Sequence, residues 1–275
     1  MWIFNYIIGK FFDILFFPFR NLDPWFGMIF ISLLTGVFML FVFGKTSNQE
    51  GIRKIKNLIK AHLLELRLFK DNFALTMKSL GNILRCNLKY IGFSAKPMLI
   101  MIIPLVLIII QMNFRFGYQS LAPGDTALLK VKLKDNINPL NVNIALNPSP
   151  GIKIETPSLR IEEESEINWR IRISREEADS IKLEISNENI KKLMTVSSAP
   201  LEKVSPLKVK PKFIPSLLYP TEPPIDKNSE IESVEITYPP GEMKFLGLAV
   251  HWLIIFFILS IAFGFALKGF LGVEI

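Results

Sequence analysis

The chain has 275 residues, half of them hydrophobic and 12% aromatic, with a formal net charge of +7. This balance is typical of a membrane protein that carries a sizeable soluble part. The excess positive charge gathers in one stretch, residues 45–96, which favours an orientation signal over a nucleic-acid-binding surface. The single cysteine, Cys86, excludes an intramolecular disulfide, and we expect it to be a small apolar filler on a helix.

Residues 1–24 are expected to form an N-terminal amphipathic helix that lies in the membrane interface. Asn5, Gly9, Lys10 and Asp13 fall on one side at helical spacing, and apolar residues occupy the rest. We expect this polar stripe to face the lipid headgroups. The alternative is an extra membrane span, in which Lys10 and Asp13 pair three residues apart. A cleavable signal peptide is disfavoured, because a basic n-region and a small-residue cleavage site are both missing.

Three apolar segments, residues 25–44, 97–116 and 245–268, are predicted to be transmembrane helices. Twenty residues at about 1.5 Å per residue match a hydrocarbon core of about 30 Å. Pro97 suits the first turn of the second span, and Pro104, in its middle, is expected to kink it. Residues 269–275 would form a short cytoplasmic tail.

Residues 45–96 are predicted to be a basic cytoplasmic helical hairpin that turns at Lys70-Asp71-Asn72. A short loop this rich in cations is retained in the cytoplasm, which places residues 117–244 outside. Apolar residues recur every three or four positions in each arm, and we expect the two stripes to face each other. They are Ile52, Ile55, Ile59, Leu63, Leu66 and Phe69 in the first arm, and Phe73, Met77, Leu80, Leu84, Leu88 and Ile91 in the second.

Residues 117–244 are predicted to be an extracytoplasmic all-β domain of the sandwich type. Short alternating segments at 126–134, 140–146, 152–161, 167–174, 181–186 and 231–238 read as strands separated by turn residues. Residues 199–224 contain seven prolines, and we expect this proline-rich strip to be extended and largely outside any sheet. The fold class is therefore an α-helical membrane protein with an inserted β domain.

Sequence motifs for catalysis are missing. We find no Gly-x-Ser-x-Gly, His-Glu-x-x-His, Cys-x-x-Cys, phosphate-binding loop or dinucleotide fingerprint. The two histidines, His62 and His251, fall in different predicted compartments, so they cannot share a metal. His62 is expected to be solvated. We therefore predict a non-enzyme with no catalytic residue, no metal site, no cofactor and no direct nucleic-acid partner.

The order of these parts resembles the YidC/Oxa/Alb superfamily of membrane protein insertases. Trp25-Phe-Gly-Met-Ile-Phe-Ile-Ser followed by Lys45-Thr-Ser-Asn-Gln is similar to the family's first core span entering its hairpin. Lys89-Tyr-Ile-Gly-Phe-Ser-Ala-Lys-Pro-Met-Leu-Ile-Met-Ile-Ile-Pro, ending at Gln111, is similar to the exit into the next span. The resemblance covers residues 5–115 and the last span, with degenerate motifs. The chain departs from bacterial members in lacking a cation at residues 35–38 and in carrying the β domain.

The resemblance implies a protein of the prokaryotic cytoplasmic (inner) membrane that assists insertion or folding of small membrane proteins. Ser32, Thr35, Gln111 and Asn113 are the candidates to line a hydrated groove between the spans. The implied contacts for a ribosome, a nascent chain or lipid are Arg53, Lys54, Lys56 and Lys60. The alternative is a non-catalytic scaffold or accessory subunit whose β domain docks an unknown envelope protein.

Overall fold

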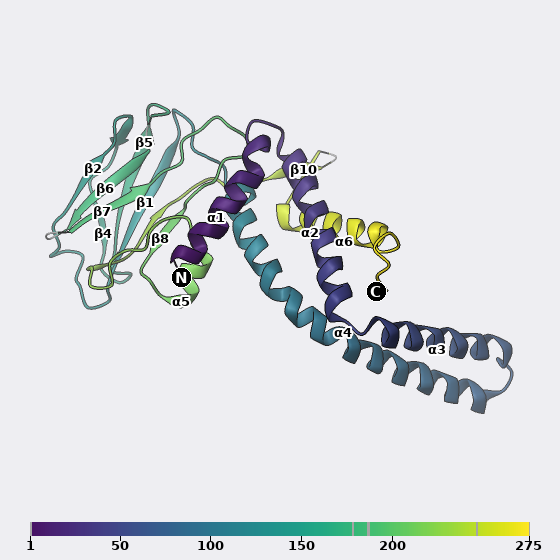
Figure 1. Ribbon diagram of the computed structural model, residues 1–275. Helices are drawn as coiled ribbons and strands as arrows, with labels where there is room; N and C mark the ends of the chain where they lie inside the picture. The colour runs from purple at the N-terminus through teal and green to yellow at the C-terminus, as the bar shows by residue number, and fades with distance from the viewer. Residues whose placement is uncertain (1, 178, 186–187, 246, 275) are drawn as a thin grey trace. The chain divides into compact units, whose positions relative to one another are not determined.

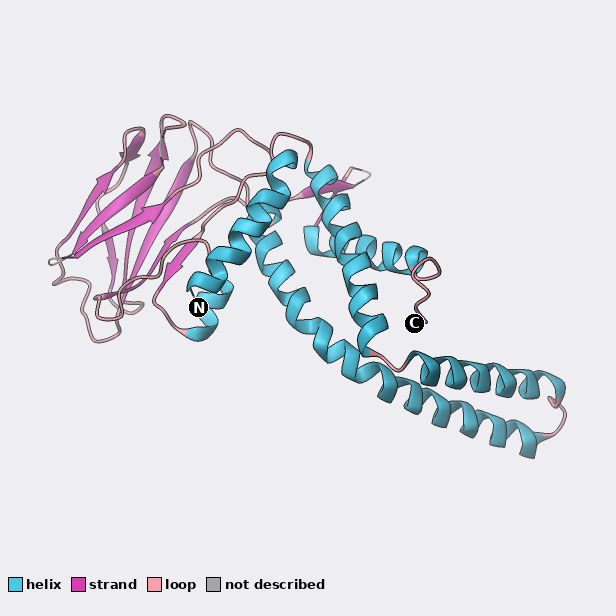
Figure 2. Cartoon of the chain, in the orientation of Figure 1, coloured by secondary structure: helices cyan, strands magenta, loops and turns pink. Residues whose placement is uncertain are grey.

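A computed structural model describes residues 2–177, 179–185, 188–245 and 247–274 of the chain (Figure 1). The chain divides into two compact units. The β unit comprises Met1–Gly27 and Ile109–Trp252, and the helical unit comprises Met28–Ile108 and Leu253–Ile275. Helices and antiparallel strands are segregated along the sequence (Figure 2), so the architecture is a mixed helix plus β-domain fold.

Among the residues that the structure describes, two helices are long and apolar enough to cross a membrane: α2 (Pro24–Thr46) and α4 (Phe73–Phe116). Helix α6 (Trp252–Leu267) is also apolar but has only 16 residues, or about 24 Å at 1.5 Å per residue. The predicted helix over 245–268 therefore begins later than expected. Strands β10 (Met243–Phe245) and β11 (Leu248–Val250) form a hairpin instead, because Gly247 adopts a left-handed conformation with φ of 83° that a helix does not use.

Helix α4 is a single helix of 44 residues, and this differs from the predicted boundary between residues 96 and 97. Pro97 and Pro104 both lie inside it. Each proline removes only one backbone donor, and the hydrogen bonds of the neighbouring turns are enough to continue the helix. The second arm of the hairpin and the predicted second span are thus one element.

Helix α3 (Gln49–Leu68) and the first half of α4 form the predicted hairpin, with the turn at residues 69–72. The side chain of Asn72 accepts a hydrogen bond from the backbone N–H of Leu75 (3.1 Å) and so caps α4. In α3, Ile52 and Ile55 are buried, as expected, but Leu63 is exposed, and so is Phe69 in the turn that follows.

The arm from α4 turns a different face inward than the one predicted. Ser79, Cys86 and Ser94 are buried, whereas the predicted stripe lies exposed on another face of the helix. Small side chains let two helices approach closely, which explains why they occupy the buried positions. We call the exposed set the hairpin stripe: Phe73, Met77, Leu80, Leu84, Leu88 and Ile91.

A polar contact crosses the hairpin between its arms. The Glu65 carboxylate lies 2.9 Å from Nδ1 of His62 and accepts a 2.9 Å hydrogen bond from the Ser79 hydroxyl. These hydrogen bonds, that of His62 first, hold the pKa of Glu65 below its ordinary value. His62 is therefore part of this contact rather than simply solvated.

The β unit contains two main antiparallel sheets (Figure 1). In the larger one the order is β3-β5-β1-β9-β8, and β4 also pairs with β5; the smaller has the order β2-β6-β7. The strand bounds are β1 Thr126–Leu133, β2 Ile144–Pro148, β3 Ile152–Ile154, β4 Leu159–Ile161, β5 Glu166–Ile173, β6 Ser180–Ile185, β7 Glu188–Leu193, β8 Leu207–Val209 and β9 Ile231–Ile236.

One hydrophobic core lies between these two sheets. Alternate residues of β1 and β5 point into it, among them Leu129 opposite Trp169, and they meet Ile181 and Leu183 of β6. The predicted strands over 126–134, 167–174, 181–186 and 231–238 are confirmed to within two residues, with residue 186 lying outside the described residues. The segment predicted at 140–146 forms a strand only from residue 144, and the one at 152–161 splits into β3 and β4, while β7 was not predicted.

The proline-rich strip is mostly extended, but it also contributes β8 and a short helix, α5 (Phe213–Leu218). A fully buried ion pair ties the strip to β7. The Lys192 ammonium contacts the Glu222 carboxylate and donates to the backbone carbonyls of Leu193 (2.9 Å) and Ser205 (2.7 Å). Burial lowers the pKa of Lys192 despite this carboxylate.

Helix α1 (Trp2–Phe16), followed by the 3₁₀ turn η1 (Phe17–Phe19), belongs to the β unit. Apart from Lys10, its polar stripe faces the protein, which corrects the expectation that the stripe faces headgroups. Asn5 is buried and donates to the backbone carbonyl of Ser216 (2.6 Å), and Asp13 forms ion pairs with Arg115 and Lys203. The stripe turns inward because the buried Arg115 guanidinium requires an anion beside it.

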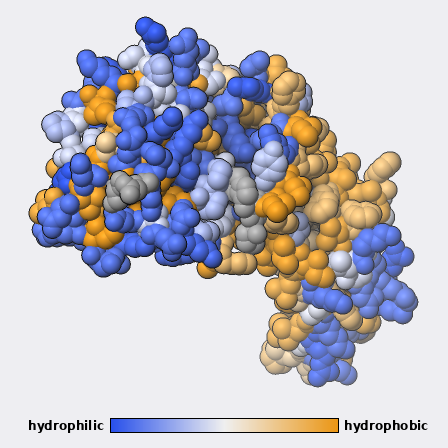
Figure 3. Space-filling view, turned by 60° about the vertical axis from the view of Figure 1, so that its left-hand side comes forward, coloured by the Kyte–Doolittle hydropathy of each residue, from blue (hydrophilic) through white to orange (hydrophobic). Residues whose placement is uncertain are grey.

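The opposite side of α1 carries exposed Ile3, Ile7 and Ile14, and Phe17 of η1 is exposed as well. The alternative pairing of Asp13 with Lys10 is not seen: Lys10 is exposed and lies over the Tyr6 ring, 5.7 Å from its centroid. On the face of the molecule in Figure 3, hydrophilic residues predominate over the strands, whereas the helical part shows hydrophobic areas together with a hydrophilic area at the lower right.

Candidate functional site

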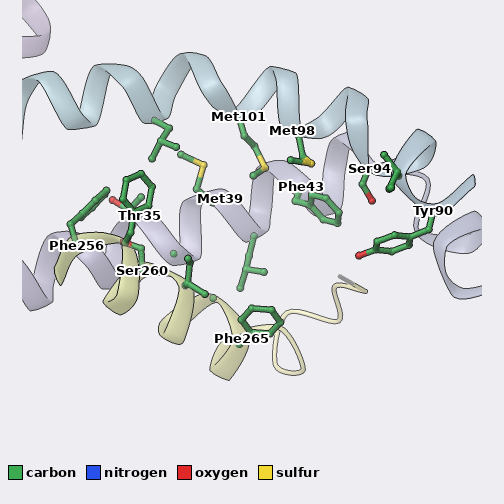
Figure 4. A pocket seen from close by; sticks show the side chains of 17 residues that line it. Thr35, Met39, Phe43, Tyr90, Ser94, Met98, Met101, Phe256, Ser260 and Phe265 are labelled. Carbon is green, nitrogen blue, oxygen red and sulfur yellow. The ribbon is translucent and has the colours of Figure 1, made fainter. Parts of the chain in front are cut away.

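The helical unit has an open cavity of about 520 Å³ between α2, α4 and α6, which we call the helix cavity (Figure 4). Its walls are almost entirely apolar. Helix α2 contributes Thr35, Gly36, Met39, Leu40 and Phe43; α4 contributes Tyr90, Ile91, Ser94, Met98, Met101 and Leu105; α6 contributes Phe256, Phe257, Ser260, Ile261, Gly264 and Phe265. Since no Asp, Glu, Lys or Arg lines it, the site favours an apolar occupant.

One end of the cavity is defined by a close approach of α2 and α6 at Gly36. A Cβ placed on Gly36 would lie 2.9 Å from the backbone oxygen of Ser260 and 3.2 Å from the backbone nitrogen of Gly264. Only glycine fits this contact without a shift of one helix, in the way that small residues let apolar helices meet. The cavity therefore lies beside a tight helix crossing.

Besides the Tyr90 phenol, three aliphatic hydroxyl groups interrupt the apolar wall, one from each helix. The side-chain oxygens of Thr35, Ser94 and Ser260 are buried, and none has a hydrogen-bond partner among the described residues. A buried hydroxyl without a partner is unfavourable by about 1–3 kcal/mol. Because these oxygens are themselves buried behind the apolar wall, a polar atom of an occupant would reach them only after the side chains rotate.

Methionine side chains supply much of the remaining lining. Met39 of α2 and Met98 and Met101 of α4 extend into the space seen in Figure 4. Methionine is unbranched and polarisable, so it can follow the surface of different apolar partners. The wall is suited to occupants that vary in shape.

Of the four predicted groove residues, only Thr35 lines the helix cavity. Ser32 is fully buried and its hydroxyl has no partner within the described residues, but it is not part of the lining. Gln111 and Asn113 belong to the β unit. The sequence shows which residues of an apolar span are polar, but not which way each side chain faces. It therefore could not predict which of these four residues line the cavity.

The lining residues that sequence reasoning missed are Ser94 and Ser260. Both are isolated hydroxyls in apolar helices, and the signal that was overlooked is their helical spacing from the cavity's apolar residues. Ser94 precedes Met98 by four residues, and Ser260 precedes Gly264 by four, so each pair shares a helix face.

The predicted basic contacts lie at the start of α3, and two of them face the chain's own tail. Lys56 contacts the Glu274 carboxylate at 3.0 Å, and Arg53 lies 3.6 Å from its other oxygen. This contact, mainly the hydrogen bond from Lys56, lowers the pKa of Glu274. Lys54 pairs with Glu50 one turn earlier at 2.6 Å, and Lys60 is exposed.

Outside the helical unit, a cluster of charged side chains centres on Asp13. Its carboxylate contacts the Arg115 guanidinium and lies 3.3 Å from the Lys203 ammonium. Burial lowers the pKa of Lys203, and Asp13 opposes this shift. Two cations on one carboxylate hold α1 against the strip and the end of α4, so we read this cluster as structural.

Within the described part of the chain, no group of three or more His, Cys, Asp or Glu side chains is placed to hold a metal ion. The helix cavity is thus the candidate site, and its chemistry is that of binding. Comparison of the chain with protein-family models, with curated proteins and with solved structures finds no match in any of the three.

Proposed function

We propose that this protein lies in the prokaryotic cytoplasmic membrane and assists the insertion or folding of small membrane proteins, binding their apolar segments in the helix cavity. The observation that carries the proposal is the cavity itself: an apolar space between α2, α4 and α6 with three unpartnered hydroxyls. An apolar helix entering it would gain packing against the methionines, and rotation of the three hydroxyl groups would offer hydrogen bonds to its polar atoms.

The proposed topology places α2 and the second half of α4 across the bilayer, with α6 beside them. The hairpin of α3 and α4 would be cytoplasmic, because it carries most of the excess cations, and the strands would be outside. The order of parts resembles the YidC/Oxa/Alb insertases, which supports the same reading. The apolar wall modifies the mechanism implied by that resemblance: the site would receive an apolar segment rather than a strongly hydrated one.

Photo-crosslinking tests this proposal directly. A photoreactive amino acid in place of Met101, inside the cavity, should capture nascent one- or two-span membrane proteins during translation into membrane vesicles. The matched control is Leu34, which lies exposed on α2 outside the cavity lining and should capture them much less. Equal capture at the two positions, or none at Met101, would contradict a client site in the cavity.

The second candidate is a scaffold or accessory subunit whose β unit docks an envelope protein. The absence of any charged side chain from the cavity lining favours it, since nothing there would attract a polar segment of a client. Depletion of the protein separates the two candidates. Insertase activity predicts reduced insertion of small membrane proteins, whereas a scaffold predicts unchanged insertion together with a fixed co-purifying complex.

A further inference from the structure

The exposed apolar face of α4 is longer than a bilayer is thick. In the half that is proposed to cross the membrane, Leu99, Ile102 and Val106 are exposed. The hairpin stripe continues this face toward the tip of the hairpin, at helical steps of three and four residues and with exposed fractions of 45–77%. From residue 73 to residue 106 the face extends about 50 Å at 1.5 Å per residue, against about 30 Å of hydrocarbon. The surplus lies on the hairpin.

A line of cations runs beside the hairpin stripe. Lys78, Arg85, Lys89 and Lys96 are all exposed and follow one side of α4, about a third of the way around the helix from the stripe. Helix α4 contains no Asp or Glu. None of the four cations forms an ion pair with any described residue of the chain, although the charge of Lys78 contributes to lowering the pKa of Glu65 on α3.

The hairpin half of α4 thus has three distinct faces: one buried against α3, one apolar and exposed, and one cationic. An apolar client segment would match the hairpin stripe but would leave the cations without counter-charge. An anionic lipid surface matches both, because acyl chains accept the apolar residues while phosphates accept the cations. Lysine and arginine side chains are long enough to reach headgroups beside an embedded stripe.

We propose that the hairpin half of α4 docks onto an anionic bilayer surface. The hairpin stripe enters the boundary between headgroups and acyl chains, and Lys78, Arg85 and Lys89 contact lipid phosphates. The inference rests on the membrane placement proposed above and extends it from the spans to the hairpin. Lipid would then cover the hairpin stripe, which the described residues of the chain leave exposed.

Spin labelling of the full-length chain in nanodiscs tests this docking. In a Cys86→Ser background, single cysteines replace Leu84 on the hairpin stripe, Ala61 on the exposed side of α3, and Val106 in the proposed span. Nanodiscs contain either phosphatidylcholine alone or phosphatidylcholine with phosphatidylglycerol. At Leu84 we expect high accessibility to oxygen and low accessibility to an aqueous nickel reagent when phosphatidylglycerol is present, as at Val106. Ala61 should stay accessible to nickel in both lipids.

The charge component is tested by replacing Lys78, Arg85 and Lys89 with glutamine, singly and together. Each replacement should weaken docking about fivefold, which corresponds to about 1 kcal/mol per cation near an anionic surface. The accessibilities of the label at Leu84 to oxygen and to the nickel reagent should then shift toward those of a label in water. Unchanged protection at Leu84 in the triple variant, or equal protection in the neutral lipid, would overturn the role given to the cations.

The remaining outcomes separate this inference from the proposed placement. If Val106 is lipid-exposed while Leu84 is aqueous in phosphatidylglycerol, the docking is wrong and the span stands. If Val106 is itself aqueous, the membrane placement fails and the docking fails with it. Protection of Leu84 that grows with protein concentration and brings spin–spin broadening would show that a second copy covers the stripe, which also overturns lipid docking.

Discussion

Replacing Glu222 by glutamine should strongly destabilise the β unit. The side chains of Lys192 and Glu222 are 0% and 1% exposed, so water cannot screen the charge that the variant leaves behind. The carboxylate also accepts hydrogen bonds from the Ser205 hydroxyl and from the backbone N–H of Leu193 (2.9 Å). Glutamine keeps the shape and one acceptor oxygen but removes the negative charge beside the ammonium.

The expected loss is about 3–5 kcal/mol, the usual consequence of removing one partner from a buried pair. It should also depend on pH. Burial already lowers the pKa of Lys192, and without its anion the folded chain holds that proton more weakly still. Between the lowered pKa and the ordinary value of 10.5 the unfolded chain binds more protons, so stability rises with pH. The defect of the Glu222→Gln variant should therefore be smaller at pH 10 than at pH 7.

Hydrogen exchange of the β1 and β5 amides in the full chain measures this loss, because these central strands report unfolding of the whole unit. The control is Glu155→Gln, which removes the exposed pair with Arg172 and should change stability by less than about 1 kcal/mol. The double variant Lys192→Met with Glu222→Leu should recover most of the loss, since it leaves no buried charge. Equal effects of Glu222→Gln and Glu155→Gln would refute the reasoning.

Three further predictions concern other parts of the molecule. Asp13→Asn leaves Arg115 and Lys203 without their anion. Because Asp13 is partly exposed, we expect the contact of α1 to lose about 2 kcal/mol of stability, so amide exchange in α1 should become about 30-fold faster. Unchanged exchange would contradict the docking of α1. Gly36→Leu should force α2 and α6 apart and reduce client cross-linking from the cavity at least about tenfold, while Gly36→Ala reduces it less; full cross-linking in both would exclude the cavity as the site. The pKa of Glu65 is lowered, so its carboxylate stabilises the hairpin fully above pH 4.5, and this stabilisation is lost as pH falls through the lowered value. Distance distributions between spin labels on the two arms should broaden in that acidic range, whereas the Glu65→Gln variant should show no such change with pH.

Sequence periodicity and chemistry account for much of the observed fold. The apolar run after Trp25, the hairpin turn at Asp71 and the alternation of β1 and β5 each follow from local rules that neighbouring residues reinforce. These predictions agree with the structure because the apolar pattern, the turn residues and the segment length all predict the same element. The burial of Cys86 follows in the same way, as a small residue on a helix face.

The face of α4 could not be deduced from hydrophobicity. Two sets of residues on α4 recur at the helical period. Hydrophobicity alone predicts that the more apolar set, the hairpin stripe, packs against α3. The structure instead buries Ser79 and Cys86, because close contact between helices depends on small size as well as on apolar character. The orientation of α1 has a similar cause: its polar stripe is satisfied by Arg115 and Lys203, which lie about 100 and 190 residues away in sequence.

The candidate site was harder to foresee than the fold. Thr35 was identified because it is a hydroxyl in an apolar run, and the same criterion also selected Ser32, which lies outside the cavity lining. Which of two neighbouring hydroxyls reaches a cavity depends on the rotation of α2 against its neighbours. That rotation is set by contacts such as the one at Gly36, which involve residues more than 200 positions apart.

The unbroken course of α4 limits how the hairpin can change in length. Each residue added to an α-helix turns everything beyond it by about 100°, so one inserted residue between Leu88 and Leu99 would rotate the two halves of the exposed face out of phase. Seven residues, close to two full turns, would restore the phase to within about 20°. Insertions or deletions of seven residues in this arm should therefore be tolerated, whereas changes of a single residue should be selected against. A change of seven residues would need a matching change in α3 to keep the two arms equal in length.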